Sequence, residues 1–248
     1  MDRSCVVTGG GQGIGRAIAA RLVADGAAVV VLDVTEPEPQ PGVTAVVGDA
    51  TEEAVALRAA ATAEGLAPLV GWVNNAAVFD DVDLATAPAD VLRVVTANLA
   101  PAVVGSSVAV RHLAERGRGG SIVNVSSHQA QRAVRGALAY ATAKAALEGL
   151  TRALAVDEGP RGIRVNAVAL GSITTARYEE HLASLDAAGR AEVQREMAQL
   201  HPLGRVGRPE EVADVVAWLL GPQSGYVSGA VLPVDGGRAA QGRDPEER

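Results

Sequence analysis

The chain has 248 residues, of which 48% are hydrophobic and 21% charged, and its formal net charge is −7 at pH 7. This composition is typical of a folded globular protein and excludes disorder as the main state. The acidic balance without a basic run argues against nucleic acid or an anionic membrane surface as a partner, and the single Cys5 excludes a disulfide framework and a cysteine zinc site.

The N-terminus lacks the cleavage pattern of a signal peptide, and we interpret its apolar stretch as a first strand. The longest purely aliphatic runs, such as 27–32, are shorter than the ~20 apolar residues of a membrane-spanning helix. We therefore expect no membrane segment and a cytoplasmic protein.

Seven short apolar runs predict strands, and longer segments of helical period separate them. The runs are nearly continuous, which indicates parallel strands buried on both faces. One helical segment, 14–25, ends before Gly26, which fits a C-cap. We therefore predict an α/β, doubly wound Rossmann fold over residues 1–237, with a parallel seven-stranded sheet and helices on both faces. The predicted strands are Cys5–Thr8, Ala28–Asp33, Thr44–Gly48, Leu69–Asn74, Ser121–Ser126, Arg164–Ala169 and Ala230–Val234.

A glycine-rich turn follows the first predicted strand and opens the first helix. Glycines let the backbone approach a pyrophosphate closely, and the helix N-terminus offers unpaired N–H groups and partial positive charge. The strand–loop–helix context favours dinucleotide binding over an ordinary loop, and a P-loop motif is absent. The predicted cofactor contacts are Gly9, Gln12, Gly13, Ile14 and Gly15.

Asp33 ends the second predicted strand, 18 residues after Gly15. An acid here can hydrogen-bond both ribose hydroxyls of the adenosine half, and its charge repels a 2′-phosphate. No Arg directly follows it. We therefore predict NAD rather than NADP as the cofactor.

Tyr140 and Lys144 are four residues apart, so a helix places them on one face. Lys144 is the single Lys in a chain with 21 Arg, which indicates chemistry that Arg does not supply. A nearby ammonium favours the phenolate and lowers the pKa of a tyrosine toward the range of a useful base. We expect Lys144 to act on Tyr140 in this way.

Ser126 and Ser127 close the fifth predicted strand, and Asn74 closes the fourth. In a parallel α/β sheet the ligand crevice lies beyond the carboxyl ends of the strands. A serine hydroxyl there can hold a substrate oxygen beside Tyr140.

The ordered motifs resemble those of a short-chain dehydrogenase/reductase of the TGxxxGxG and YxxxK branch, over about residues 4–237. Ala77 and Leu170 depart from the family pattern, where glycine and proline are usual; they put the local backbone and the nicotinamide loop in doubt. The resemblance implies Asn98, Ser127, Tyr140 and Lys144 as catalytic residues. It also implies cofactor contacts at Asp49, Ala50, Asn75, Ala76, Tyr140, Lys144, Gly171, Ile173 and Thr175.

The resemblance implies hydride transfer between nicotinamide and a carbinol or carbonyl carbon, with Tyr140 as general base or acid. Ser127 would polarise the substrate oxygen, Lys144 would tune Tyr140 and hold the nicotinamide ribose, and Asn98 would position a water for proton relay. The partner is then a small alcohol or ketone. The resemblance also implies a homotetramer or dimer built on the helix after Tyr140 and on the helix around 102–113.

The insert at about 176–205 corresponds to a lid over the substrate in the family. His128, next to Ser127, is a candidate to hydrogen-bond a second substrate group, such as a vicinal hydroxyl. The polar tail 238–248 is expected to be loose or to pack on a neighbouring subunit. The candidate substrate contacts are His128, Gln129, Val134, Tyr178 and His181.

Two alternatives to an NAD-dependent alcohol dehydrogenase stay open. One is an NADPH-linked ketoreductase of fatty-acid or polyketide type, which Asp33 disfavours. The other is a non-catalytic dinucleotide-binding regulator, which the four catalytic candidates disfavour. A serine hydrolase lacks its GxSxG elbow, and the four His show no metal-ligand spacing, so we expect no metal.

Overall fold

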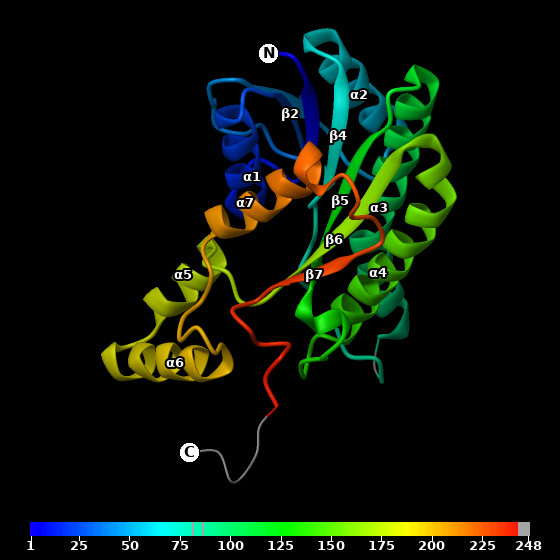
Figure 1. Ribbon diagram of the computed structural model, residues 1–248. Helices are drawn as coiled ribbons and strands as arrows, with labels where there is room; N and C mark the ends of the chain where they lie inside the picture. Colours follow the sequence, from blue (N-terminus) through cyan, green and yellow to red (C-terminus); the bar gives the residue numbers. More distant parts are fainter. Residues whose placement is uncertain (81, 86, 243–248) are drawn as a thin grey trace.

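The computed structural model describes residues 1–80, 82–85 and 87–242, without the side chain of residue 177. It contains a parallel seven-stranded sheet in the order β3-β2-β1-β4-β5-β6-β7 (Figure 1). The doubly wound α/β fold is thus confirmed. The two ends of each predicted strand lie within two residues of the ends of an observed strand. The strands are β1 Ser4–Thr8, β2 Ala28–Asp33, β3 Val43–Val47, β4 Leu69–Asn74, β5 Gly120–Ser127, β6 Ile163–Leu170 and β7 Val231–Val234.

Helices cover both faces of the sheet, as Figure 1 shows. α1 (Gly13–Ala24) and α7 (Pro209–Leu220) pack on one face. α2 (Glu53–Leu66), α3 (Pro88–Arg116) and α4 (Leu138–Glu158) pack on the other. The insert folds as α5 (Ala176–Ser184) and α6 (Ala187–Leu200), which extend away from the sheet. Three short 3₁₀ turns complete the described secondary structure: η1 His128–Ala130, η2 Gly159–Arg161 and η3 Pro222–Ser224.

The pleat of the strands explains why their apolar runs are continuous. In β1, Cys5 and Val7 enter the core beneath α1 and α7, whereas Val6 enters the core beneath α2 and α3. Successive side chains of a strand point to opposite faces, so a sheet covered on both sides needs apolar residues at every position.

Gly26 ends α1 as its position predicted. Its φ is +84°, its N–H donates to the Val23 carbonyl at 2.9 Å, and the N–H of Ala27 donates to the Leu22 carbonyl at 3.0 Å. This pair of bonds is a Schellman motif, in which the left-handed residue is usually glycine because other residues are strained there. The turn sends the chain directly into β2.

α3 is the helix that bears on the expectation of no membrane segment. Its 29 residues are long and apolar enough, by length and composition, to cross a membrane. The helix lies against the sheet, however, with Val94, Val108 and Leu113 almost fully buried. Its apolar residues therefore serve the protein core.

A buried polar network joins the middle of the sheet to α3 and α4. The Asn74 amide donates to the Ser106 hydroxyl at 3.0 Å and to the Asn124 side-chain oxygen at 2.8 Å. Asn124 then donates to the Thr151 hydroxyl at 2.9 Å, and the Trp72 indole donates to Asn74 at 2.9 Å. Because these groups satisfy one another, their burial costs little and fixes how the two helices sit on the sheet.

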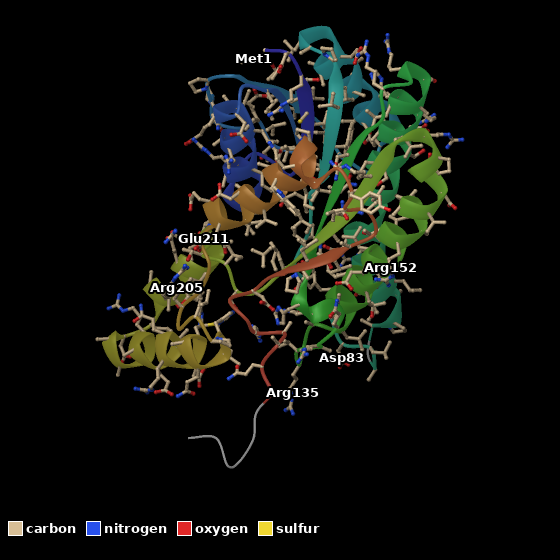
Figure 2. The ribbon with its side chains drawn as sticks, in the orientation of Figure 1. Met1, Asp83, Arg135, Arg152, Arg205 and Glu211 are labelled. Atoms are coloured by element: carbon tan, nitrogen blue, oxygen red, sulfur yellow. The ribbon has the colours of Figure 1, made fainter. Side chains whose placement is uncertain are left out.

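The strand order reverses between β1 and β4, which are neighbours in the sheet although β2 and β3 come between them in the chain. Ligand crevices of open α/β sheets lie at such a reversal, beyond the carboxyl ends of the strands. Figure 2 shows Met1 at the amino ends of the strands and Asp83 and Arg135 at the opposite end. The segments after β1, β4, β5 and β6 thus gather at this carboxyl edge.

Candidate functional site

The loop between β1 and α1 is tightly folded on its glycines. Gly13 adopts a left-handed φ of +53°, and a Cβ on Gly15 would lie 2.1 Å from the Gly9 carbonyl oxygen. Gln12, the N-cap of α1, makes no side-chain capping bond, so no side chain of this residue occupies the first N–H groups of the helix. Ile14 packs partly against the core beneath α1 and anchors the helix start. An uncapped helix N-terminus behind a glycine loop fits a pyrophosphate.

Asn75 holds this loop rather than lying free to contact a ligand. Its amide donates to the Gly9 carbonyl at 2.8 Å and to the Thr8 carbonyl at 3.2 Å. In return the Thr8 hydroxyl accepts the N–H groups of Asn75 at 3.0 Å and Ala76 at 3.2 Å. The start of the segment after β4 is thereby fastened to the end of β1.

Asp33 lies at the carboxyl end of β2, next to the glycine loop. Its Oδ2 accepts the Gly11 N–H at 2.9 Å, and its Oδ1 accepts the Thr35 N–H at 3.3 Å. The Thr35 hydroxyl also donates to Oδ1 at 3.4 Å, so these bonds fix the carboxylate and leave Oδ2 a further lone pair. Asp49 lies exposed after β3 and accepts the Thr51 N–H at 2.8 Å, and Ala50 beside it is buried.

The candidate catalytic groups Ser127, Tyr140 and Lys144 come together where β5 meets α4. Lys144 is 2% exposed, its Nζ donates to the Val125 carbonyl at 2.8 Å, and Nζ lies 5.4 Å from the centre of the Tyr140 ring. The Tyr140 phenol shares a hydrogen bond with the Ser127 hydroxyl. Ser126 points the other way and donates to Glu148, so Ser127 is the serine at the site.

The pKa values of this pair correct the expected electrostatics. Burial raises the pKa of the Tyr140 phenol to about 12, and only the bond with Ser127 opposes that rise. Burial also lowers the pKa of the Lys144 ammonium to about 8. The prediction that Lys144 brings the pKa of Tyr140 down is therefore wrong for this structure, because desolvation of the phenol dominates its pKa.

Asn98 lies on α3 and is 1% exposed. Its side-chain oxygen accepts the Val78 N–H at 3.0 Å and its amide donates to the Val94 carbonyl at 3.0 Å. Phe79, which follows Val78 in the chain, stacks on Tyr140 with ring centres 4.7 Å apart. Asn98 thus fixes the segment that covers Tyr140, and its side chain is already engaged at both ends.

The segment after β6 holds the remaining cofactor candidates. Gly171 passes so close to β7 that a Cβ would lie 2.8 Å from the Cα of Asp235. Ile173 forms a bridge with Gly207, and the Thr175 hydroxyl accepts the Tyr178 N–H at 3.4 Å to cap α5. The backbone here is defined without the proline usual in the family.

The structure brings some of the candidate substrate residues to the site and not others. Ser127 pairs with Leu170 in the sheet, and the next residue, His128, hydrogen-bonds the Leu170 carbonyl. Gln129 donates its N–H to the Ser127 hydroxyl at 3.2 Å. The three other candidates make no side-chain hydrogen bond or ring contact to this group among the described residues: Val134 is exposed on the loop before α4, and Tyr178 and His181 lie on α5.

Sequence reasoning missed Arg238, which it assigned to a loose tail. The Arg238 guanidinium donates to the Ser172 hydroxyl at 3.3 Å, and Asp235 accepts the Ala239 N–H at 2.7 Å. The N–H of Gln241 donates to the Gly237 carbonyl at 3.2 Å. Arg238 is therefore tied to the segment after β6, residues 239 and 241 are tied to the turn after β7, and 243–248 lie outside the described residues. No pattern around Arg238 marks this contact, because it joins segments 66 residues apart.

His201 was also missed. It is 1% exposed, its Nδ1 donates to the Met197 carbonyl at 2.7 Å, and its Nε2 accepts the Ser172 N–H at 3.2 Å. It joins the end of α6 to the segment after β6.

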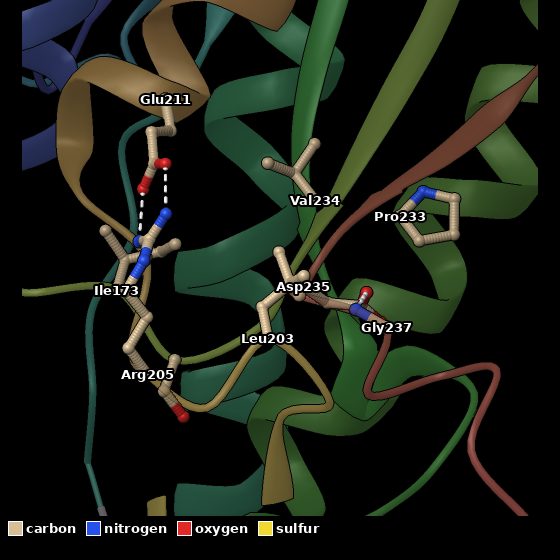
Figure 3. A pocket seen from close by; sticks show the side chains of 11 residues that line it. Ile173, Leu203, Arg205, Glu211, Pro233, Val234, Asp235 and Gly237 are labelled. Carbon is tan, nitrogen blue, oxygen red and sulfur yellow. Dashed lines mark hydrogen bonds and ion pairs between the residues drawn. The ribbon is translucent and has the colours of Figure 1, made fainter. Parts of the chain in front are cut away.

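A cavity of about 280 Å³ lies between the base of the insert and β7, and Ser172, the hydrogen-bond partner of His201, lines it (Figure 3). Arg205 and Glu211 form a bidentate ion pair on its wall, in which the guanidinium donates to the two carboxylate oxygens at 2.6 and 2.8 Å. The cavity shares Ser172 and Ile173 with the cofactor candidates but does not include Tyr140. It is therefore a neighbour of the catalytic candidates and does not enclose them.

Comparisons with known proteins agree with this arrangement. A family model described as "Enoyl-(Acyl carrier protein) reductase" matches residues 9–239. Levodione reductase of Leifsonia aquatica is 36% identical, with 96% of this chain and 95% of that protein covered. The chain belongs to the short-chain dehydrogenase/reductase family.

Two further members extend the comparison. L-xylulose reductase of Bos taurus is 36% identical, with 95% of this chain and 96% of that protein covered. The ligand-free structure of the aldohexose dehydrogenase of Thermoplasma acidophilum superposes with a TM-score of 0.91 at 30% identity, covering 100% of this chain and 98% of that one. The chain is thus an oxidoreductase of the kind that interconverts alcohols and ketones, in a family that uses NAD(P) cofactors.

Replacing Asn75 by Ala should raise the KM for the nicotinamide cofactor roughly 10-fold while changing kcat little, since each lost hydrogen bond contributes ~1 kcal/mol to holding the loop. Steady-state kinetics with varied cofactor measure both constants. Thr51→Ala, an exposed change near the same edge, is the control. A fall in kcat with an unchanged KM would contradict the anchoring role.

Proposed function

We propose that this chain is an NAD-dependent dehydrogenase that interconverts a secondary alcohol and a ketone, with Tyr140 as general acid and base. The observation that carries the proposal is the phenol of Tyr140 hydrogen-bonded to Ser127, with the buried ammonium of Lys144 one helical turn away. All three lie at the carboxyl edge of the sheet, where ligand crevices of this fold occur.

Each residue has a defined part in the proposed reaction. Ser127 donates to the substrate oxygen and orients it toward Tyr140. Tyr140 takes the hydroxyl proton in oxidation and returns it in reduction. Positioned acid–base groups of this kind contribute typically ~10²–10⁴-fold to a rate.

The cofactor-binding residues fit NAD. The glycine loop and the uncapped start of α1 would hold the pyrophosphate, Asp33 would accept from the adenosine ribose, and the segment after β6 would hold the nicotinamide. When bound, the nicotinamide supplies or accepts the hydride. Phe79, stacked on Tyr140, helps to exclude water from the phenol.

Lys144 would hold the nicotinamide ribose, and Asn98 supports Tyr140 in this proposal. Both ends of the Asn98 side chain are engaged, so it acts mainly by fixing the segment that carries Phe79. α3 also contains Pro101, which has no N–H to give to the carbonyl of Ala97. Because the usual bond from the residue four positions on is missing, that carbonyl would be an acceptor for the relay water expected beside Asn98.

Asp33→Asn should lower the preference for NAD over NADP by roughly 10–100-fold, because like charges brought together at a binding site cost several kcal/mol and the amide removes one of them. The measurement is kcat/KM for each cofactor. Asp25→Asn, at the far end of α1, should leave the ratio unchanged. A wild-type protein that prefers NADP would instead support the NADPH-linked ketoreductase.

We further propose that the chain associates through α3 and α4. Val103 on α3 and Leu138 and Val156 on α4 are large apolar side chains with 44%, 45% and 76% exposure. Apolar side chains left exposed on two neighbouring helices favour a subunit interface. Light scattering coupled to gel filtration tests this, and a monomer at micromolar concentration would argue against it.

A further inference from the structure

His128 is held in one orientation by the end of β6. It is 7% exposed, and its Nδ1 lies 3.1 Å from the carbonyl oxygen of Leu170. A carbonyl oxygen only accepts hydrogen bonds, so Nδ1 carries the hydrogen. In the neutral ring the other nitrogen, Nε2, is then an acceptor with a lone pair.

The surroundings keep this ring neutral. Burial and the charge of Arg238 lower the pKa of His128, and the Leu170 bond and Asp235 oppose that shift only in part. His201 also faces the ring and lowers its pKa further. At neutral pH, therefore, Nε2 presents a lone pair and not a hydrogen.

Two buried acceptors at the site have no partner among the described residues. They are Nε2 of His128 and Oε1 of Gln129, on the two residues that follow Ser127. Buried polar atoms in folded proteins are nearly always paired. Two adjacent unpaired acceptors beside the candidate catalytic serine indicate a ligand that donates hydrogen bonds.

The neighbouring charge narrows the chemistry of that ligand. An ammonium group would suit the two acceptors but would meet the positive Arg238, whose effect on the pKa of His128 is larger than the opposite effect of the negative Asp235. A carboxylate would suit Arg238 but has no hydrogen to give to Nε2. A hydroxyl donates, accepts and carries no charge, so it suits both neighbours.

We propose that Nε2 of His128 accepts a hydrogen bond from a second, non-reacting hydroxyl of the substrate, and that the enzyme prefers diols and polyols over simple alcohols. This inference rests on the proposed function, since it takes Ser127 and Tyr140 to hold the reacting oxygen. It makes His128 a specificity-determining residue. A site built around a hydroxyl discriminates strongly against an analogue that lacks it, because its polar groups are then left unpaired.

The test compares trans-1,2-cyclohexanediol with cyclohexanol as substrates and NAD as cofactor. His128→Asn keeps a donor to the Leu170 carbonyl, since its amide nitrogen matches Nδ1, but it removes Nε2. We expect the ratio of kcat/KM for the diol to that for cyclohexanol to fall at least ~10-fold. His128→Gln, whose amide reaches the place of Nε2, should restore part of the ratio, and His112→Asn on α3 should not change it.

A binding experiment separates this inference from the proposed function. In Tyr140→Phe with NAD present, calorimetry should show that adding His128→Asn weakens binding of the diol roughly 10-fold more than binding of cyclohexanol. Equal losses for both ligands, or a wild-type ratio near one, would overturn the role of His128. Full turnover by Tyr140→Phe would overturn the proposed function while leaving the binding result readable.

Discussion

Tyr140→Phe is expected to reduce turnover at least ~10³-fold while changing the affinity for NAD less than ~3-fold, because the change deletes the proton-transfer group and leaves the ring in place. The ring packs on Phe79, and Phe retains that contact. The measurements are the steady-state rate of cofactor reduction and a fluorescence titration with NAD.

Tyr226→Phe provides the matched control. Tyr226 is fully exposed, so loss of its hydroxyl should leave both the rate and the affinity unchanged. A Tyr140→Phe variant that retained more than about a tenth of the wild-type rate would remove Tyr140 from the acid–base role, because a positioned acid–base group is worth more than that. A large loss of NAD affinity would show instead that the variant disturbs the cofactor site.

The high pKa of Tyr140 sets the resting state of the proposed reaction. With a pKa of about 12, the phenol is protonated at neutral pH and poised to donate to a ketone. Oxidation needs the phenolate. We therefore expect the bound ligands to change the surroundings of Tyr140 so that its pKa falls. The bond with Ser127 already acts in this direction.

Much of the fold could be predicted from the sequence because its signals are local. Continuous apolar runs such as 28–33 exist only where both faces of a strand are covered, and Gly26 marks a helix end that other residues strain to form. Apolar length alone does not distinguish a core helix such as α3 from a membrane one, whereas burial of Val94, Val108 and Leu113 against the sheet does.

The site was predictable where one motif or one strand end carries it, as with the pair Tyr140 and Lys144. It was not predictable where distant segments meet. Arg238 reaches Ser172, and His201 joins α6 to the same residue, through tertiary contacts that leave no periodic trace. Desolvation is also a tertiary property, so the direction of the pKa shift of Tyr140 could not be inferred from a Lys four residues away.

Lys144→Met is expected to stabilise the protein at pH 7 while lowering turnover at least ~10²-fold, because the ammonium that would position the nicotinamide ribose is lost. The ammonium is 2% exposed and its described hydrogen bond is to the Val125 carbonyl, so burial of its charge carries a large cost. The fall of its pKa from 10.5 to about 8 corresponds to roughly 3 kcal/mol of lost stability at neutral pH. Met fills a similar volume without that cost and forgoes a bond worth ~1 kcal/mol. A net gain of ~1–2 kcal/mol should appear in urea unfolding.

A difference in packing alone would not make the stability gain of Lys144→Met depend on pH, whereas burial of a charged Lys144 does. Below pH 8 the ammonium is charged in both states, and the full cost of its burial is present. Between pH 8 and 10.5 the folded protein loses this proton first, so the unfolded chain binds more protons and stability rises with pH. The advantage of Lys144→Met over the wild type should therefore shrink across that window. A constant advantage from pH 7 to 10 would show that Lys144 is not buried as a charge.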